Sequence, residues 1–153
     1  VGAVSGKDEL FENEIGETFV CSKTASTGKL KKMIYNRYDP SLQKHKTILI
    51  NRKIKRFNET NWYSWGRSIN FQEGKPRIYV NCKTRNVNPF FLSSCHKWDG
   101  SILALFPKIN LDLGKAAKAL NSIDWNALGF VTGRRYIFGQ KSLQEALIDE
   151  NIF

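Results

Sequence analysis

Cationic side chains are concentrated in residues 29–56, which hold ten Lys or Arg against a single acid, Asp39. The whole chain of 153 residues has a formal net charge of +10, so less than a fifth of its length carries nearly all of the excess. Ammonium and guanidinium groups bind phosphate oxygens, and charge of one sign in a short segment attracts polyanions. The pattern predicts a polyanionic partner, with nucleic acid as the first candidate and an anionic membrane surface as the second.

Aromatic rings follow these cations. Residues 52–67 read Arg-Lys-Ile-Lys-Arg-Phe-Asn-Glu-Thr-Asn-Trp-Tyr-Ser-Trp-Gly-Arg, and in such a mixture basic groups bind phosphates while rings stack on bases or wedge into a groove. The alternative is that Trp62 and Trp65 are core residues and the charges form a solvated surface. Because the charge exceeds what solubility needs, we favour phosphate contacts. The expected phosphate-binding residues are Lys31, Lys32, Arg52, Lys53, Lys55 and Arg56, and Trp65 and Arg67 are expected to reach bases or a groove.

A loop between two expected strands carries groups suited to reading base edges. Arg forms bidentate hydrogen bonds with guanine and Asn does so with adenine. We therefore expect base or groove contacts from Lys83, Arg85, Asn86 and Asn88. A polar turn whose Asn side chains bond their own backbone fits the same composition equally well.

Paired arginines occur again in the segment Gly133-Arg134-Arg135-Tyr136. Two guanidinium groups on a turn suit phosphate or guanine, and we expect Arg134 and Arg135 to bind phosphate. The alternative is that they are surface residues paired with Asp124 or Asp149.

Residues of catalytic type do not form a convincing set. Asn88-Pro89-Phe90-Phe91 approaches the Asn/Asp-Pro-Pro-Tyr/Phe motif of amino-directed DNA methyltransferases, but its third position is Phe. The chain also lacks the Gly-rich strand-to-helix turn that binds S-adenosylmethionine. Glu73-Gly74-Lys75 has the letters of a nuclease motif but falls in an expected turn, and the Cys and His residues lack zinc-site spacing. We expect no catalytic residue, metal or cofactor within this chain.

Short strands are expected to position these groups. Apolar patterning and turn signals predict strands at residues 17–23, 29–37, 77–81, 90–93 and 101–106. In the third of these, Ile78 and Val80 alternate with Tyr79, which predicts one buried and one exposed face.

Helices are expected in the intervals. Asp39-Pro40 is a helix start signal, after which Leu42, His45, Ile48 and Leu49 share one face. A second helix is predicted over residues 111–121, with Leu113, Ala116, Ala117 and Leu120 on one side. Ser122 is expected to cap a short helix that Gly129 ends, and Ser142 a last helix to residue 148, with Glu145 in a capping box. The mixture predicts an α+β fold: a single domain with a small mixed or antiparallel sheet and helices packed on it.

The broad class also follows from length and composition. A chain of this length suits one domain, and no apolar run is long enough to span a bilayer. Three cysteines without close pairing predict a reducing cytoplasm. Residues 1–16 are Gly-rich and acidic, and we expect them to be a linker that continues a longer protein.

Several segments together resemble the target-recognition domains of gamma-type adenine-specific DNA methyltransferases. Residues 1–11 are similar to the segment that links the catalytic and recognition domains in that family. The further similar segments, in order, are residues 49–58, 62–67, 77–90, 99–107 and 133–136. The resemblance covers most of the chain and implies a bacterial restriction-modification enzyme of the cytoplasm.

The resemblance also implies a division of labour. A separate domain, linked covalently but absent here, would bind S-adenosylmethionine, flip an adenine out of the duplex and methylate its amine. Residues 1–153 would be a single, monomeric, non-catalytic domain that reads double-stranded DNA, with residues 1–16 as its linker. Two alternatives stay open: a small nuclease that uses Asp99 or Glu73 with a divalent ion, and a basic domain that binds RNA or an acidic protein.

Overall fold

The computed structural model describes residues 16–67 and 69–153. Apart from Gly16, the expected linker of residues 1–16 lies outside this part, as does the 1–11 segment of the family resemblance. The chain divides into two compact units: unit 1 comprises Val1–Phe19 and Leu30–Phe71, and unit 2 comprises Val20–Lys29 and Gln72–Phe153. Each unit is described by itself below. That residues 1–153 act as one recognition domain stays a prediction.

Unit 1 contains a two-stranded antiparallel sheet. Strand β1 (Glu17–Phe19) pairs with β2 (Lys31–Met33), with Glu17 opposite Met33 and Phe19 opposite Lys31. Both strands lie within the segments predicted from the sequence but are shorter. Phe19 packs on a cluster of rings from the rest of the unit: its centroid is 5.5 Å from that of Trp65 and 6.0 Å from that of Phe71.

Two short helices follow in unit 1, the 3-10 helix η2 (Pro40–His45) and α2 (Lys46–Ile50). Asp39 caps η2 as predicted, because its Oδ1 accepts a hydrogen bond from Ser41 N at 2.9 Å. Leu42 and Leu49 are buried in a small core with Ile34 and Trp62. Ile48, predicted on the same face, is instead 43% exposed. A 3-10 helix has three residues per turn, whereas the prediction assumed one continuous helix with 3.6. The predicted face is therefore not continuous from η2 into α2.

Unit 2 is built on a three-stranded antiparallel sheet in the order β5 (Phe90–Phe91), β3 (Ile78–Asn81), β6 (Ile102–Leu105). Every residue of β3 is buried, so the predicted exposure of Tyr79 is wrong. The Tyr79 ring packs beside Phe91 and Trp98, and its hydroxyl donates to Cys95 O at 2.6 Å. The side chain of Tyr79 is buried because Trp98 and the backbone of Cys95, in the segment between β5 and β6, contact it.

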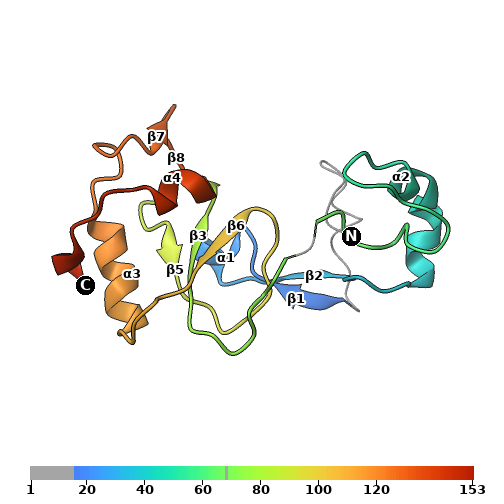
Figure 1. Ribbon diagram of the computed structural model, residues 1–153, viewed down its shortest axis with the longest axis horizontal. Helices are drawn as coiled ribbons and strands as arrows, with labels where there is room; N and C mark the ends of the chain where they lie inside the picture. The colour runs from blue at the N-terminus through green and yellow to red at the C-terminus, as the bar shows by residue number, and fades with distance from the viewer. Residues whose placement is uncertain (1–15, 68) are drawn as a thin grey trace. The chain divides into compact units, whose positions relative to one another are not determined.

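Helix α3 (Leu113–Ser122) contacts β5 and buries Ala116, Ala117 and Leu120, as the sequence predicted (Figure 1). Its core partners are the strand residues Ile78, Val80 and Phe90 together with Trp125, Phe130 and Phe138. Ser122 was predicted to begin another helix but is the last residue of α3, where its Oγ donates to Ala119 O. Residues 125–129 form a turn instead, because the Trp125 indole donates to Leu120 O at 2.8 Å and folds the chain back.

A second antiparallel sheet in unit 2 has the order β4 (Lys83–Thr84), β8 (Arg135–Ile137), β7 (Val131–Thr132). The remaining elements are α1 (Thr24–Thr27), α4 (Gln140–Gln144) and η3 (Glu150–Ile152). Ser142 lies inside α4, whose N-cap is Gly139, so the predicted cap and capping box are wrong. Gly139 has extended backbone and lets the helix begin directly after the buried Phe138.

Helices and small antiparallel sheets together confirm the α+β class. All three cysteines are free thiols. Within the described residues, no helix combines the length and the apolar character required to cross a bilayer.

Candidate nucleic-acid interface

A buried arginine precedes the exposed basic loop of unit 1. Arg52 is only 9% exposed, and its Nε donates to Leu49 O at 2.7 Å. Its Nη2 donates to the carbonyls of Trp62 and Ser64 at 2.7 and 2.8 Å, and the guanidinium lies 3.9 Å from the centroid of the Phe57 ring. These contacts tie the end of α2 to residues 57–64. The expectation that Arg52 binds phosphate is therefore corrected, since its Nε and Nη2 donate to carbonyls within the unit and its Nη1 is buried.

Arg52 still carries its charge at neutral pH. Burial lowers the pKa of the guanidinium from its ordinary value to about 10, which is well above pH 7. Three carbonyl acceptors and an aromatic ring compensate for the loss of water around this cation.

The next residues along the chain form a loop anchored at both ends. Residues 53–56 are all exposed, and the buried Phe57 ends the loop. In the middle, the side chain of Ile54 lies against Gly66, where an added Cβ would meet Ile54 Cδ1 at 2.8 Å. Three cations therefore project from a loop whose backbone is held at residues 52, 54 and 57. This loop of residues 53–56 is called the basic loop below, and its cations are Lys53, Lys55 and Arg56.

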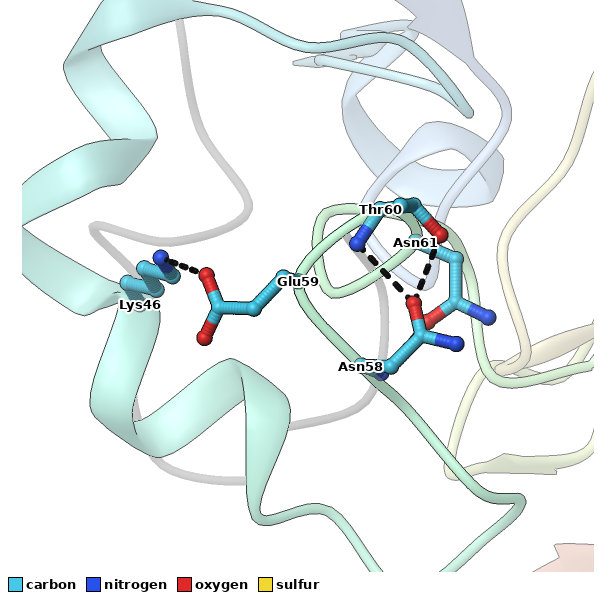
Figure 2. A network of polar contacts seen from close by, with 5 residues as sticks. All are labelled: Lys46, Asn58, Glu59, Thr60 and Asn61. Carbon is cyan, nitrogen blue, oxygen red and sulfur yellow. Dashed lines mark hydrogen bonds and ion pairs between the residues drawn. The ribbon is translucent and has the colours of Figure 1, made fainter.

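The one acid between residues 40 and 67 is engaged elsewhere. Glu59 forms an ion pair with Lys46 (Figure 2). The turn that carries Glu59 is fixed by Asn58, whose Oδ1 accepts from the N and Oγ1 of Thr60 at 2.9 and 2.7 Å, and by Asn61, whose Oδ1 accepts from Asn58 N. Lys53 and Arg56 have no acidic partner among the described residues, so the charge of the basic loop is not neutralised within the described part of unit 1.

The other expected residues of unit 1 lie in different settings. Lys31 and Lys32 stand on β2, half-buried and exposed respectively, and both interact with other groups of the chain. Arg67 is exposed. Trp65 is 6% exposed and stacks on Phe19, so the alternative that it is a core residue holds and its expected contact with bases is corrected.

In unit 2, strand pairing gathers expected residues that are far apart in the sequence. Thr84 of β4 pairs with Tyr136 of β8, so Arg85 leaves β4 at the end of the sheet where Arg135 begins β8. Arg134 directly precedes β8 and is exposed in the turn that joins β7 to β8. The φ angle of Arg134 is +62° and that of Gly133, in the same turn, is +56°. Lys83 and Arg85 are exposed as well. The set of Lys83, Arg85, Arg134 and Arg135 is called the sheet cluster below.

The sheet cluster is free of ion pairs within the described part of the chain. The proposed acidic partners bind their own loops instead: Asp124 accepts from Ala127 N at 3.0 Å, and Asp149 accepts from Asn151 N at 2.9 Å. Arg134 and Arg135 therefore do not form the alternative ion pairs with Asp124 or Asp149.

The loop after β4 is an ordered polar turn. Asn86 N donates to Thr84 Oγ1, and Asn86 Oδ1 accepts from Asn88 N, each at 3.0 Å. The polar-turn interpretation thus describes Asn86, whereas the side chain of Asn88 is exposed. Sequence reasoning missed Asn121, whose side chain bonds both N and O of Phe90 at 2.9 and 2.8 Å and fixes the end of this loop.

The residues considered for catalysis lie in the core, in a turn or in a loop hydrogen bond. Phe90, the third position of the Asn88-Pro89-Phe90-Phe91 segment, is 2% exposed and stacks on Trp125, so this position belongs to the core. Glu73 lies in a turn as expected, and Asp99 Oδ1 accepts from Ser101 N at 2.9 Å. No group of three His, Cys, Asp or Glu side chains comes together as a metal site in the part of the chain that the structure describes.

S-adenosylmethionine does not fit the described residues. Its usual site needs a strand that enters a helix through a Gly-rich turn, whereas the strands of the three sheets here pair antiparallel, and no such turn joins one to a helix among the described residues.

Comparisons with protein-family models, with curated proteins and with solved structures find no match to this chain.

Proposed function

We propose that this chain recognises double-stranded DNA without catalysing a reaction on it. The basic loop of unit 1 makes contacts with phosphates, which are the same for every sequence. In the sheet cluster of unit 2, Arg134 and Arg135 bind phosphate. Lys83 and Arg85 of the cluster, together with Asn88, supply the groups that read base edges.

The observation that carries this proposal is an anchored loop whose charge no described residue compensates. Lys53, Lys55 and Arg56 are exposed, the nearest acid in sequence is paired with Lys46, and Arg52 holds the preceding backbone. A fixed loop loses little conformational entropy on binding, so its cations suit a regularly spaced polyanion. The described part of unit 1 supports this with ten basic residues against three acidic ones.

The family resemblance leads us to propose a wider setting. The chain would be the target-recognition part of a gamma-type adenine-specific DNA methyltransferase in a restriction-modification system, with S-adenosylmethionine bound by a separate linked domain. A bacterial cytoplasmic location and a monomeric state remain predictions of the same resemblance.

The test is a binding titration of the purified chain with a fluorescent DNA duplex across salt concentrations. We expect the logarithm of the binding constant to fall linearly with the logarithm of salt between about 50 and about 200 mM. Binding that does not change with salt, or no binding at low salt, contradicts the proposal. Structured RNA as competitor tests the alternative partner, since RNA that displaces the duplex at equal concentration favours an RNA-binding domain.

Two further measurements separate the remaining alternatives. Selection from a library of random duplexes should enrich one short sequence, and a library that stays random contradicts sequence-specific recognition. Supercoiled plasmid incubated with the chain and Mg²⁺ should stay intact, whereas nicking supports the nuclease alternative.

A further inference from the structure

Tyr38 is an exposed ring on an aromatic cluster within the basic unit. Its side chain is 52% exposed, and its centroid lies 6.0 Å from those of both Trp62 and Tyr63. The contacts are edge-to-face, with interplanar angles of 79° and 71°. Trp62 is 3% exposed and anchors the cluster in the core of η2 and α2. Tyr38 is therefore supported by two rings while more than half of its own surface remains in solvent.

The backbone on both sides of Tyr38 is fixed. Two residues earlier, Asn36 has a positive φ of +48°, and its Oδ1 accepts a hydrogen bond from Trp65 N at 2.8 Å. One residue later, Asp39 caps η2 through Ser41. These two bonds hold the turn that presents the ring, so the position of Tyr38 is set before any partner binds.

One cation contacts this cluster, and further basic residues lie near Tyr38 in the sequence. Lys46 Nζ lies 5.8 Å from the centroid of Trp62, and Lys44 is exposed on η2. Arg37 precedes Tyr38 directly. An apolar peptide or a lipid tail gains little binding energy from neighbouring basic residues. A nucleotide offers a ring that stacks on Tyr38 and a phosphate that binds the cations.

We propose that Tyr38 stacks on an unpaired base within a DNA duplex. This inference rests on the proposed function and adds to it a contact that phosphate binding does not require. The bases of an intact duplex have both faces covered by their neighbours, so a protein ring gains a stacking partner only where a base is unpaired or leaves the stack. The cluster would thus give the chain a preference for duplexes with such a base.

The experiment compares two duplexes of one sequence, fully paired or with a single 2-aminopurine bulge. The wild-type chain should bind the bulged duplex more tightly and quench the 2-aminopurine fluorescence, because stacking on an aromatic ring quenches this base. Tyr38→Leu should lose the quenching and about tenfold in affinity for the bulged duplex. The slope of affinity against salt should stay unchanged, and Tyr38→Phe should retain the wild-type behaviour.

Matched controls separate this inference from the proposed function. Ile48→Ala removes an exposed apolar side chain of the same unit and should alter neither signal; the thermal midpoint of each variant reports whether it folds. If Tyr38→Leu binds and quenches like the wild type, the inference fails while salt-dependent DNA binding stands. If the wild type prefers the paired duplex, the inference also fails. If no duplex binds at all, the proposed function itself fails and takes this inference with it.

Discussion

Each unit of this chain contains one buried arginine that bonds three backbone carbonyls. In unit 1, Arg52 bonds the carbonyls of residues 49, 62 and 64 and lies over the ring of Phe57. In unit 2, Arg77 bonds the carbonyls of residues 72, 75 and 96 and lies over the rings of Trp98 and Phe106. A guanidinium suits this task because its planar, forked donors satisfy several carbonyls at once while its face packs on aromatic carbon.

The two arginines differ in the segment that each one precedes. Arg77 leads directly into β3, whose four residues are all buried. Arg52 leads into the basic loop, whose four residues are all exposed and three of them cationic. The same interaction therefore fixes the start of a core strand in one unit and the start of a charged loop in the other. Burial of a cation identifies a structural anchor, and only the neighbouring residues indicate whether the anchor positions a binding surface.

The largest effect is expected from removing the anchors themselves. Arg52→Met and Arg77→Met each leave three carbonyls without their donor, and we expect each to lower the free energy of unfolding by about 2–4 kcal/mol. Urea unfolding of both variants measures this. Either variant with wild-type stability would show that its arginine is dispensable for its unit.

The lysine variants then separate structure from binding. Arg52→Lys and Arg77→Lys keep the charge but lose the fork, so both should destabilise the chain. In duplex titrations at a temperature where both variants are folded, only Arg52→Lys should weaken binding. Equal weakening by Arg77→Lys would remove the contrast between the two arginines.

The next effect distinguishes the basic loop from the sheet cluster. Arg85→Ala should cost about 1–3 kcal/mol of discrimination between the selected duplex and a random one, because a base contact is lost. Lys53→Ala should weaken binding to both duplexes alike and reduce the salt slope by about one. Titrations of both variants with both duplexes measure this, and Lys141→Ala, whose side chain lies 3.9 Å from Glu145, is the control for a basic residue outside either set. A loss of specificity in Lys53→Ala would reverse the assignment.

A smaller effect is expected from moving the basic loop without changing its charge. A Cβ at residue 66 would press on Ile54 and displace the basic loop. Because the loop would then be less preorganised for binding, Gly66→Ala should weaken duplex binding about twofold to fivefold. The double variant Gly66→Ala, Ile54→Ala should recover the affinity. Gly100→Ala is the matched control in unit 2, because its added Cβ would meet nothing within 4 Å. Failure of the double variant to recover would mean that Ile54 does not anchor the loop.

The smallest effect concerns a feature that the units share. Asp39 caps η2 in unit 1 and Asp112 caps α3 in unit 2, and the pKa of each carboxyl is lowered mainly by hydrogen bonds, from Ser41 and from Lys115 respectively. A carboxyl with a lowered pKa in the folded state stabilises the fold above its ordinary pKa of 3.8 and loses this contribution as pH falls through the lowered value. Circular dichroism should therefore show helix loss only below about pH 4.

Asparagine variants of the caps check this pH dependence. Asp39→Asn and Asp112→Asn keep a cap that does not titrate in this range, so each should flatten the acid transition of its own helix. Unchanged acid transitions in both variants would assign the pH dependence to other carboxyls.

Local signals predicted part of this molecule well. The Asp39-Pro40 start, the helix with Ala116, Ala117 and Leu120 on its buried face, and the α+β class all follow from interactions between near neighbours in sequence. Predicted helix boundaries at Ser122 and Ser142 are wrong, because a Ser is a cap only where the chain enters the helix at that residue. The residue at which the chain enters a helix depends here on the burial of Trp125 and Phe138.

By itself, the sequence determined how many cations this protein carries and in which segments they are concentrated, since charge is a property of residue types. Tertiary structure decided which of these cations are exposed: it buried Arg52 against three carbonyls and left its three basic neighbours in solvent. It also brought Arg85 to the same end of one sheet as Arg135, which lies far later in the chain. The physical reason is that burial and strand pairing depend on contacts between distant segments, which composition and local periodicity do not encode.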